Sequence, residues 1–359
     1  MTNPIEQLFD RIMRWDGQGV RVDDGALPGL ARLGFVRSVR TPEFDGITFH
    51  EILCKSALNK VPDAAMLPFR YTVNGYRGCA HACRYCFART THEYLDFDPG
   101  ADFDTEIVVK TNVAEVLARE LRRRSWTREA VALGTNTDPY QRAEGRYRLM
   151  PGILAALAES GTPFSILTKG TLLRRDLPLI AEAAHDGAGA RVSISLAIGD
   201  PDLQRSIEPG TPSPQARLAL ISAVRDAGLD CHVMVAPVLP RLTDSVEHLD
   251  ALLRRIADAG ATGATVFGLH LRGATRGWFM SWLQCTHPQH VPEYQRLYRR
   301  GAYLPAEYRN ELRIRAAPLL ARYGLTRRSA GVAMSAPATP AGAGAVSSEV
   351  AAPAHPTLF

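Results

Sequence analysis

Short β-branched runs alternate with helical patterns along most of the chain, and this alternation constrains the fold most. Residues 131–133, 164–167 and 191–196 are such runs, and each precedes a segment with apolar residues at helical spacing. Strand-then-helix repetition is typical of parallel βα units. Residues 71–270 hold roughly six units of ~30 residues, fewer than the eight of a closed barrel. The sequence therefore predicts an α/β fold, a partial (β/α)6 TIM-like barrel over residues 70–271.

An open doubly wound sheet is the alternative fold. It would need a glycine-rich phosphate turn after its first strand. A cysteine-rich loop follows the first predicted strand, residues 69–73, instead. This loop favours the partial barrel.

Two extensions and a tail flank the predicted barrel. Residues 1–69 form an N-terminal extension, with an amphipathic helix at 5–15, short strands at 35–39 and 46–52, and a linker at 55–68. Residues 272–325 form a C-terminal helical extension, in which the spacing of Tyr294, Leu297 and Tyr298 predicts core packing. Alanine, proline, glycine and serine dominate residues 326–359, which predicts a disordered tail.

The chain has no apolar run of membrane-spanning length and no signal peptide at its N-terminus. Six cysteines in such a chain indicate a reducing compartment, where clustered thiols bind metals in preference to forming disulfides. We therefore expect a cytoplasmic protein without a membrane partner.

Three cysteines, Cys79, Cys83 and Cys86, follow the first predicted strand at C-x3-C-x2-C spacing. Thiolates this close repel one another unless a cation neutralises them, so they indicate a metal centre. A structural zinc site normally has four closed ligands. Three cysteines suit a [4Fe–4S] cluster whose fourth iron stays open to a small molecule. A zinc knuckle closed by His81 or His92 is the alternative.

The aromatic Tyr85 before the last cysteine completes a pattern that resembles radical S-adenosylmethionine (SAM) enzymes. The wider strings 74–79 and 86–89 resemble the spore photoproduct lyase-like branch of that superfamily. The resemblance implies a [4Fe–4S] cluster on the three cysteines, SAM at the open iron, and a reductant such as flavodoxin or ferredoxin. It implies a lyase-like or oxidoreductase-like enzyme that cleaves SAM reductively to a 5'-deoxyadenosyl radical, which takes hydrogen from its substrate.

The resemblance also assigns SAM contacts, which lie at successive predicted strand ends: Tyr85, Phe87, Thr137, Asp138, Lys169, Ser195 and Ala236. The two aromatic residues would line the adenine or methionine side. Thr137 and Asp138 would hold the amino group, and Lys169 the carboxylate. Ser195 would lie near the ribose, and the backbone of Ala236 would contact adenine.

The chain departs from the lyases at Thr135, which stands where they carry a hydrogen-donating cysteine. A hydroxyl donates a hydrogen atom poorly compared with a thiol, so thymine-dimer repair by the lyase mechanism is not predicted. Cys231 begins its strand, at the wrong end of the barrel. Cys285, near His287 and His290, is either a second redox or metal position or a surface cysteine. The catalytic residues and the substrate stay open.

Two arginine-rich runs, in residues 119–128 and 296–315, are either solvated faces or a nucleic-acid groove. The second, interleaved with tyrosines, is the better candidate for DNA or RNA, although a peptide or small metabolite stays open as substrate. The predicted loop 199–214 and the helix after it add three candidates for SAM or substrate contacts: Arg205, Glu208 and Arg217. The terminal Leu358 and Phe359 loosely resemble a peptide that docks on the replication sliding clamp. A non-catalytic iron–sulfur or zinc module that binds nucleic acid is the alternative function.

Overall fold

The computed structural model describes residues 34–62, 67 and 69–326. The predicted helix at 5–15, most of the predicted tail and the terminal Leu358 and Phe359 lie outside these residues. All six cysteines lie within them and are free thiols. Among the described residues, no helix combines the length and apolar character that crossing a membrane requires.

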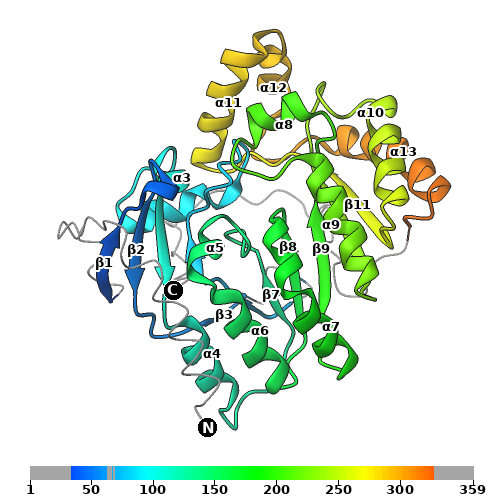
Figure 1. The fold of residues 1–359 in the computed structure, drawn as a ribbon. Helices are drawn as coiled ribbons and strands as arrows, with labels where there is room; N and C mark the ends of the chain where they lie inside the picture. The colour runs from blue at the N-terminus through cyan, green and yellow to red at the C-terminus, as the bar shows by residue number, and fades with distance from the viewer. Residues whose placement is uncertain (1–33, 63–66, 68, 327–359) are drawn as a thin grey trace, which may run out of the picture.

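The fold is a mixed α/β fold built on a seven-stranded sheet in the order β11-β10-β9-β8-β7-β4-β3 (Figure 1). Six of its strands are parallel: β4 (Tyr71–Val73), β7 (Val131–Leu133), β8 (Phe164–Thr168), β9 (Arg191–Ser195), β10 (Cys231–Val238) and β11 (Gly263–Gly268). The short edge strand β3 (Leu58–Lys60) runs antiparallel to β4 within a segment predicted to be a linker. The six parallel strands are those that the sequence pattern predicts.

The helices between these strands, apart from the short α5, bury one apolar face each. They include α4 (Val113–Leu121), α5 (Ala143–Tyr147), α6 (Leu149–Glu159), α7 (Leu177–His185), α9 (Pro214–Asp226) and α10 (Val246–Asp258). Helix α10 is typical: Leu249, Leu252, Leu253 and Ile256 are buried at helical spacing, and Ser245 caps its first turn. One prediction was wrong here, because the loop predicted at 199–214 contains helix α8 (Pro201–Ile207).

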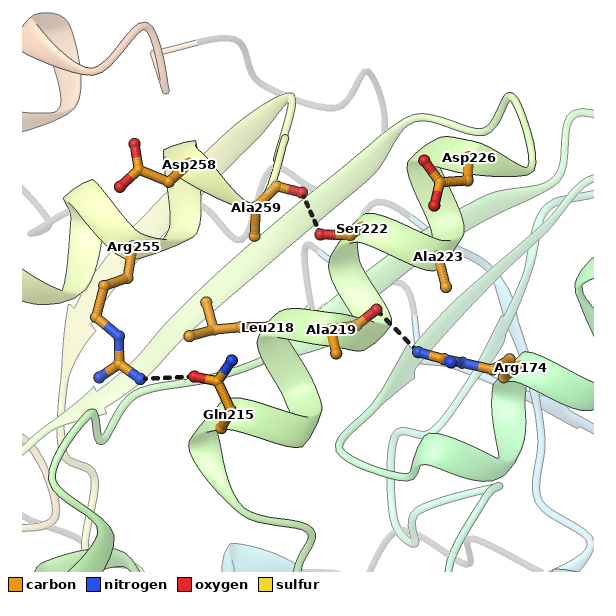
Figure 2. Close-up of a pocket in the computed structure, with 10 residues that line it drawn as sticks. All are labelled: Arg174, Gln215, Leu218, Ala219, Ser222, Ala223, Asp226, Arg255, Asp258 and Ala259. Atoms are coloured by element: carbon orange, nitrogen blue, oxygen red, sulfur yellow. Dashed lines mark hydrogen bonds between the residues drawn. The ribbon is translucent and has the colours of Figure 1, made fainter.

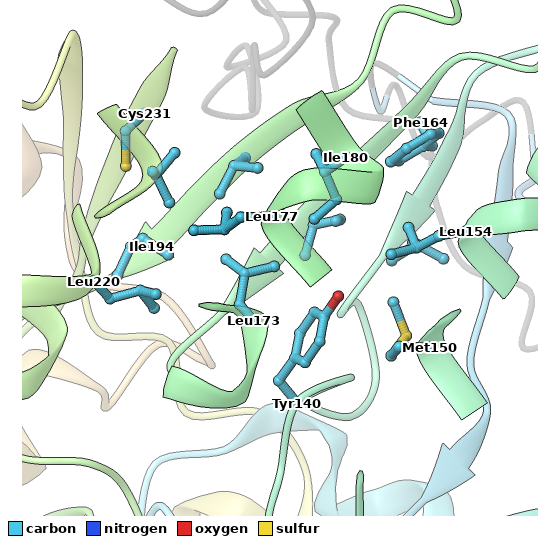
Figure 3. Close-up of a cluster of buried hydrophobic side chains, with 14 of the residues drawn as sticks. Tyr140, Met150, Leu154, Phe164, Leu173, Leu177, Ile180, Ile194, Leu220 and Cys231 are labelled. Carbon is cyan, nitrogen blue, oxygen red and sulfur yellow. The ribbon is translucent and has the colours of Figure 1, made fainter. Parts of the chain in front are cut away.

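The main core fills the space between the sheet and these helices. Phe164 and Ile194 from the strands meet Ile180 and Leu220 from the helices (Figure 3). Cys231 is the first residue of β10 and is fully buried in this core (Figure 3), whereas Cys79 and Cys83 belong to other clusters of buried residues. Cys54 packs half-buried against this core.

A second sheet, in the order β1-β2-β6-β5, contains β1 (Phe35–Val39), β2 (Thr48–Ile52), β6 (Glu106–Lys110) and β5 (Tyr76–Arg77). Strands β1 and β2 were predicted, whereas β6, which pairs in parallel with β2, was not. A polar row crosses this sheet, where Ser38 Oγ lies 2.8 Å from Nδ1 of His50 and Nε2 of His50 lies 2.7 Å from Glu106.

The C-terminal extension contains α11 (Ala274–Thr286), α12 (Val291–Leu297) and α13 (Ala306–Arg322). Helix α13 packs on β11 and α10 (Figure 1). Tyr294, Leu297 and Tyr298 are buried, which confirms their predicted core packing. They belong to a smaller core that also contains Cys83 and Tyr85, so the extension packs directly on the cysteine loop.

Candidate functional site

The cysteine loop lies where several parallel strands end. The loop itself follows β4 and β5, and it leads into the 3-10 segment η4 (Phe87–Leu95). Cys79 and Cys83 are buried and Cys86 is half-buried. Because parallel strands share the edge at which they end, residues after β7, β8, β9 and β11 can all reach this loop.

Segments that follow three of these strands hold the loop through its backbone. After β7, Thr137 donates to the carbonyl of Gly78 at 2.7 Å, and Gln141 accepts from the amide of Ala80 at 2.9 Å. After β9, the amide of Gly210 donates to the carbonyl of His81 at 3.1 Å. After β11, Thr275 donates to the carbonyl of Cys86 at 2.9 Å. The loop is therefore fixed from several directions.

Asp138 joins the cysteine loop to the end of β8. Its carboxylate accepts from the hydroxyl of Thr168 at 2.5 Å and from the amide of Lys169 at 2.7 Å, and it lies 3.3 Å from Nδ1 of His81. Burial disfavours the charged form of both side chains, but the attraction between the two opposite charges is stronger. The pKa of Asp138 therefore falls to about 2, and that of His81 rises to about 10. Asp138 is thus an ionised group whose oxygens are largely engaged within the protein.

A buried ion pair lies under Tyr85. Glu208 and Arg217 are both fully buried, with Arg217 Nη2 2.6 Å from Glu208 Oε2. The hydroxyl of Tyr85 donates to the other oxygen of Glu208, and Arg217 also donates to the carbonyl of Ser195 at 3.1 Å. The pair therefore positions Tyr85 and the end of β9. Arg205, the third candidate of this segment, is exposed and pairs with Asp202.

Lys169 brings a positive charge to the same place. Its ammonium nitrogen lies 5.7 Å from the centre of the Tyr85 ring. Burial opposes its charge, but the Cys83 thiolate and the Glu208 carboxylate outweigh burial and raise the pKa of Lys169. No hydrogen bond or ion pair of the Lys169 ammonium is found among the described residues, so this cation is available to an anionic ligand.

The other predicted residues differ in burial and in their place in the fold. Ser195 is buried at the end of β9, and Ala236 is half-buried within β10, which extends three residues beyond the strand that the sequence pattern predicts at residues 231–235. Phe87 is 52% exposed at the start of η4. Thr135 is half-buried at the end of β7, with its hydroxyl 3.5 Å from the Asn74 side chain. Cys285 is exposed on α11.

Arg89, which sequence reasoning gave no role, lies beneath the loop. Its side chain is fully buried, and it donates to the carbonyls of Cys83 and Gly100 at 2.9 and 2.6 Å and to Asp104 at 2.8 Å. Its guanidinium also packs over the Trp278 ring at 5.0 Å. Gln141 and Thr275 were likewise missed, because a lone glutamine or threonine outside the motif gives no signal.

The donor set fits a cluster better than a single ion. Burial raises the pKa of Cys83 and Cys86, the latter to about 11. Each cysteine that ionises would raise the pKa of the other cysteines further. Three thiolates in this loop therefore need a cationic partner. One zinc ion would bring its thiolates to about 3.8 Å from one another, given bonds of about 2.3 Å. Across the described residues, no three His, Cys, Asp or Glu side chains gather closely enough to hold one metal ion. A cluster places each cysteine on a different iron and needs no such convergence.

A surface hollow of ≈ 500 Å³ lies elsewhere, between α9 and α10 (Figure 2). Several of its polar side chains are engaged within the protein: Arg174 donates to the carbonyl of Ala219, and Ser222 to that of Ala259. It is lined by none of the predicted cofactor residues. We therefore place the candidate site at the cysteine loop.

Comparison with known proteins identifies a family that contains the cysteine loop within its matched range. The sequence model of the Radical SAM superfamily matches residues 73–256. An uncharacterised protein of Mycobacterium tuberculosis (strain H37Rv) is 74% identical over 318 residues, which cover 87% of this chain and 93% of that protein. An uncharacterised protein of Methanocaldococcus jannaschii is 25% identical over 201 residues, covering 55% and 70%.

The fold is similar to that of spore photoproduct lyase. The structure of that enzyme complexed with dinucleoside spore photoproduct has a TM-score of 0.56 at 18% identity and covers 77% of this chain and 79% of that one. A mutant of it with bound AdoMet and dinucleoside spore photoproduct has a TM-score of 0.57 at 16% identity, with the same coverage. At this identity the likeness concerns the fold alone.

Proposed function

The chain belongs to the radical SAM superfamily, and we propose that it is an enzyme that cleaves SAM reductively and takes a hydrogen atom from its substrate. The radical SAM family uses a [4Fe–4S] cluster and SAM. The observation that carries the proposal is the placement of three clustered cysteines in one loop, held by residues that follow several parallel strands. Cys79, Cys83 and Cys86 would hold the cluster.

When bound, the cluster and SAM supply an electron and a 5'-deoxyadenosyl radical that abstracts hydrogen. The chain's own residues bind and orient. Lys169, whose ammonium is available, would pair with the carboxylate of SAM. Tyr85, Phe87, Ser195 and Ala236 would surround the adenosine. Thr137 and Asp138 are already engaged with Gly78, Thr168 and Lys169, so their main role would be to position the loop, with the amino group as a further partner.

We also propose that the parallel sheet curves into a partial (β/α)6 barrel over residues 70–271. The order of its six parallel strands and the similarity to the spore photoproduct lyase fold support this. The carboxyl ends of the strands would then line one mouth, which places the cysteine loop where chemistry occurs in parallel barrels.

The reaction would differ from that of the lyases, since Thr135 cannot replace a hydrogen-donating thiol. A flavodoxin or ferredoxin would supply the electron. DNA or RNA stays a proposed substrate, but the second arginine run supports it only in part: Arg296 pairs with Glu293 and Arg315 with Asp244. Tyr298 is buried, so Tyr303, 38% exposed, is the tyrosine of this run best placed to stack on a base. The sliding-clamp peptide and the cytoplasmic location stay predictions.

One experiment tests the enzyme directly. Protein reconstituted with iron and sulfide without air is reduced with dithionite and given SAM, and 5'-deoxyadenosine is measured. We expect its formation in the wild type and its loss in Cys83→Ala. Cys285→Ser, which alters an exposed thiol outside the site, should keep both the cluster and the reaction. Zinc as the bound metal, with no SAM cleavage, would favour the non-catalytic nucleic-acid module instead.

A further inference from the structure

The segment after β11 lies against the chain that leads into α13. His270 forms an isolated antiparallel bridge with Tyr303, and the amide of Leu271 donates to the carbonyl of Ala302 at 2.8 Å. The rings of His270 and Tyr303 meet edge to face, with centroids 4.7 Å apart. This pairing fixes where the side chains of residues 270–272 lie.

Arg272 lies at this corner, and Arg309 is close enough for its charge to act on His270. The guanidinium of Arg272 lies 4.9 Å from the centre of the Tyr303 ring, and it donates to the Tyr303 hydroxyl. Arg309, from the first turn of α13, has a buried Nε without a hydrogen-bond partner. Neither guanidinium forms an ion pair with a carboxylate of the described residues. Burial lowers the pKa of His270 to about 4, and the charges of Arg272 and Arg309 add to this effect; among the described residues, no acidic group acts against them.

Two guanidiniums without a carboxylate partner among the described residues, together with a buried donor that lacks an acceptor, favour the binding of an anion. We propose that Arg272, Arg309 and His270 bind a phosphate group of the substrate. A phosphate monoester carries about −1.5 to −2 charges at pH 7 and three acceptor oxygens. It can therefore neutralise both guanidiniums, whereas a carboxylate neutralises one. Arg272 is exposed and Tyr303 partly so, which leaves the corner open to solvent.

The corner lies within reach of the cysteine loop, and here the inference rests on the proposed function. Thr275 donates to the carbonyl of Cys86, and five residues span at most ~18 Å. The α-carbon of His270 is therefore no farther than this from that of Thr275. A substrate anchored here through its phosphate would extend toward the SAM-binding group. The phosphate site thus names the substrate class: a phosphorylated compound, either a nucleotide or a smaller phosphate ester.

The test is calorimetric titration of the reconstituted, SAM-loaded full chain at constant ionic strength. The probes are inorganic phosphate, ribose 5-phosphate, uridine 5'-monophosphate and uridine. We expect the three phosphates to bind at least ten-fold more tightly than uridine. Arg309→Gln and Arg272→Gln should each weaken phosphate binding about ten-fold or more. Arg299→Gln, which removes an exposed charge on the neighbouring turn, should change it less than two-fold. Tighter binding of the nucleotide than of ribose 5-phosphate would identify a nucleotide source, and the reverse a smaller ester.

A second readout does not depend on turnover. Phosphate should raise the pKa of His270, followed by NMR of its ring and assigned with His270→Gln. Equal binding of uridine and its monophosphate, or unchanged phosphate affinity in both arginine variants, would overturn the proposal. If the wild type does not cleave SAM, this result refutes only the proposed radical reaction. The phosphate proposal is tested separately, because the titration measures binding and does not require SAM cleavage.

Discussion

The hydroxyl of Thr275 donates to the carbonyl of Cys86 at 2.9 Å, although 189 residues separate the two in sequence. Thr275 is fully buried at the start of α11. This bond ties the C-terminal extension to the last residue of the cysteine triad. The extension is therefore part of the framework that shapes the site, as the shared smaller core with Cys83 and Tyr85 also indicates.

Thr275→Val should loosen the cysteine loop, because valine keeps the shape but leaves the carbonyl of Cys86 without its donor. We expect a loss of about 1–2 kcal/mol in the free energy of unfolding and several-fold faster release of iron to a chelator from the reconstituted protein. Thr275→Ser keeps the hydroxyl and should release iron at nearly the wild-type rate. Equal rates in the valine and serine variants would show that the hydrogen bond does not restrain the loop.

Gly210→Ala should disrupt the contact between the α8–α9 connection and the cysteine loop. A Cβ at residue 210 would lie 1.9 Å from the carbonyl oxygen of Ala80, so one of two backbones must move. Such overpacking costs about 1–3 kcal/mol, measured by urea unfolding. Gly277→Ala is the matched control, because nothing lies within 4 Å of its Cβ and it sits in α11. It should be neutral or stabilising by up to about 1 kcal/mol; a similar loss in both variants would contradict the close contact.

Arg89→Met should be among the most destabilising changes near the site. It removes donors from two carbonyls and leaves the carboxylate of Asp104 buried without a partner, which costs about 3–5 kcal/mol. Arg84→Met is a useful comparison, since Arg84 packs over the same Trp278 ring at 5.3 Å and acts on Asp104 only as a weaker charge, with no ion pair between them among the described residues. It should cost about 1 kcal/mol or less.

The pH dependence of the Arg89→Met variant gives a sharper check. Burial raises the pKa of Asp104 to about 6 even with Arg89 beside it. A carboxyl with a raised folded-state pKa loses stability as pH rises from its unfolded value to its folded value. Removing Arg89 should raise the folded-state pKa of Asp104 further and so extend this pH range upward. The loss in the free energy of unfolding of the variant, relative to wild type, should therefore be larger at pH 8 than at pH 5. A deficit independent of pH would mean that Asp104 does not sense Arg89.

The parts of the fold that the sequence predicts correctly are those with local signals. The strands β7, β8 and β9 follow hydrophobic periodicity, and the cysteine triad follows spacing. Strand β6 was missed because its apolar run Ile107–Val109 has no flanking turn signal and pairs with β2, far away in sequence. Helix α8 could have been found, since Asp200 caps it and Pro201 occupies its first turn.

The site was predictable in its cysteines but not in its supporting contacts. Gln141 and Arg89 hold the loop by bonds to backbone carbonyls and amides, and no residue pattern encodes such a partner. Glu208 and Arg217 were candidates for SAM or substrate contacts, yet they bind each other in full burial. Whether a charged residue faces a ligand or another side chain depends on tertiary packing, which spacing in the sequence does not define.

Acid should weaken the main core at His232, which begins the contact between β10 and β11. His232 is 3% exposed, and its Nε2 lies 2.8 Å from the hydroxyl of Thr265. Burial lowers the pKa of His232 to about 4, below the value of about 6.5 in the unfolded chain. Folding thus favours the neutral form of His232. Its contribution to the free energy of unfolding is complete above pH 6.5 and is lost as the pH falls toward 4.

From these two pKa values, His232 should lower the free energy of unfolding by about 2 kcal/mol when the pH falls from 7.5 to 5. In His232→Gln the amide can keep a bond to Thr265 but binds no proton, so this variant should lose that much less stability over the same interval. His185→Gln, at an exposed position of α7, should keep the wild-type loss. Urea unfolding at both pH values gives the change in the free energy of unfolding for wild type and variant. The effects of the other buried histidines cancel in this comparison because both proteins contain them. Parallel losses in wild type and His232→Gln would mean that His232 takes up its proton in the folded core. The described part of the chain places no acidic side chain where it would favour that proton.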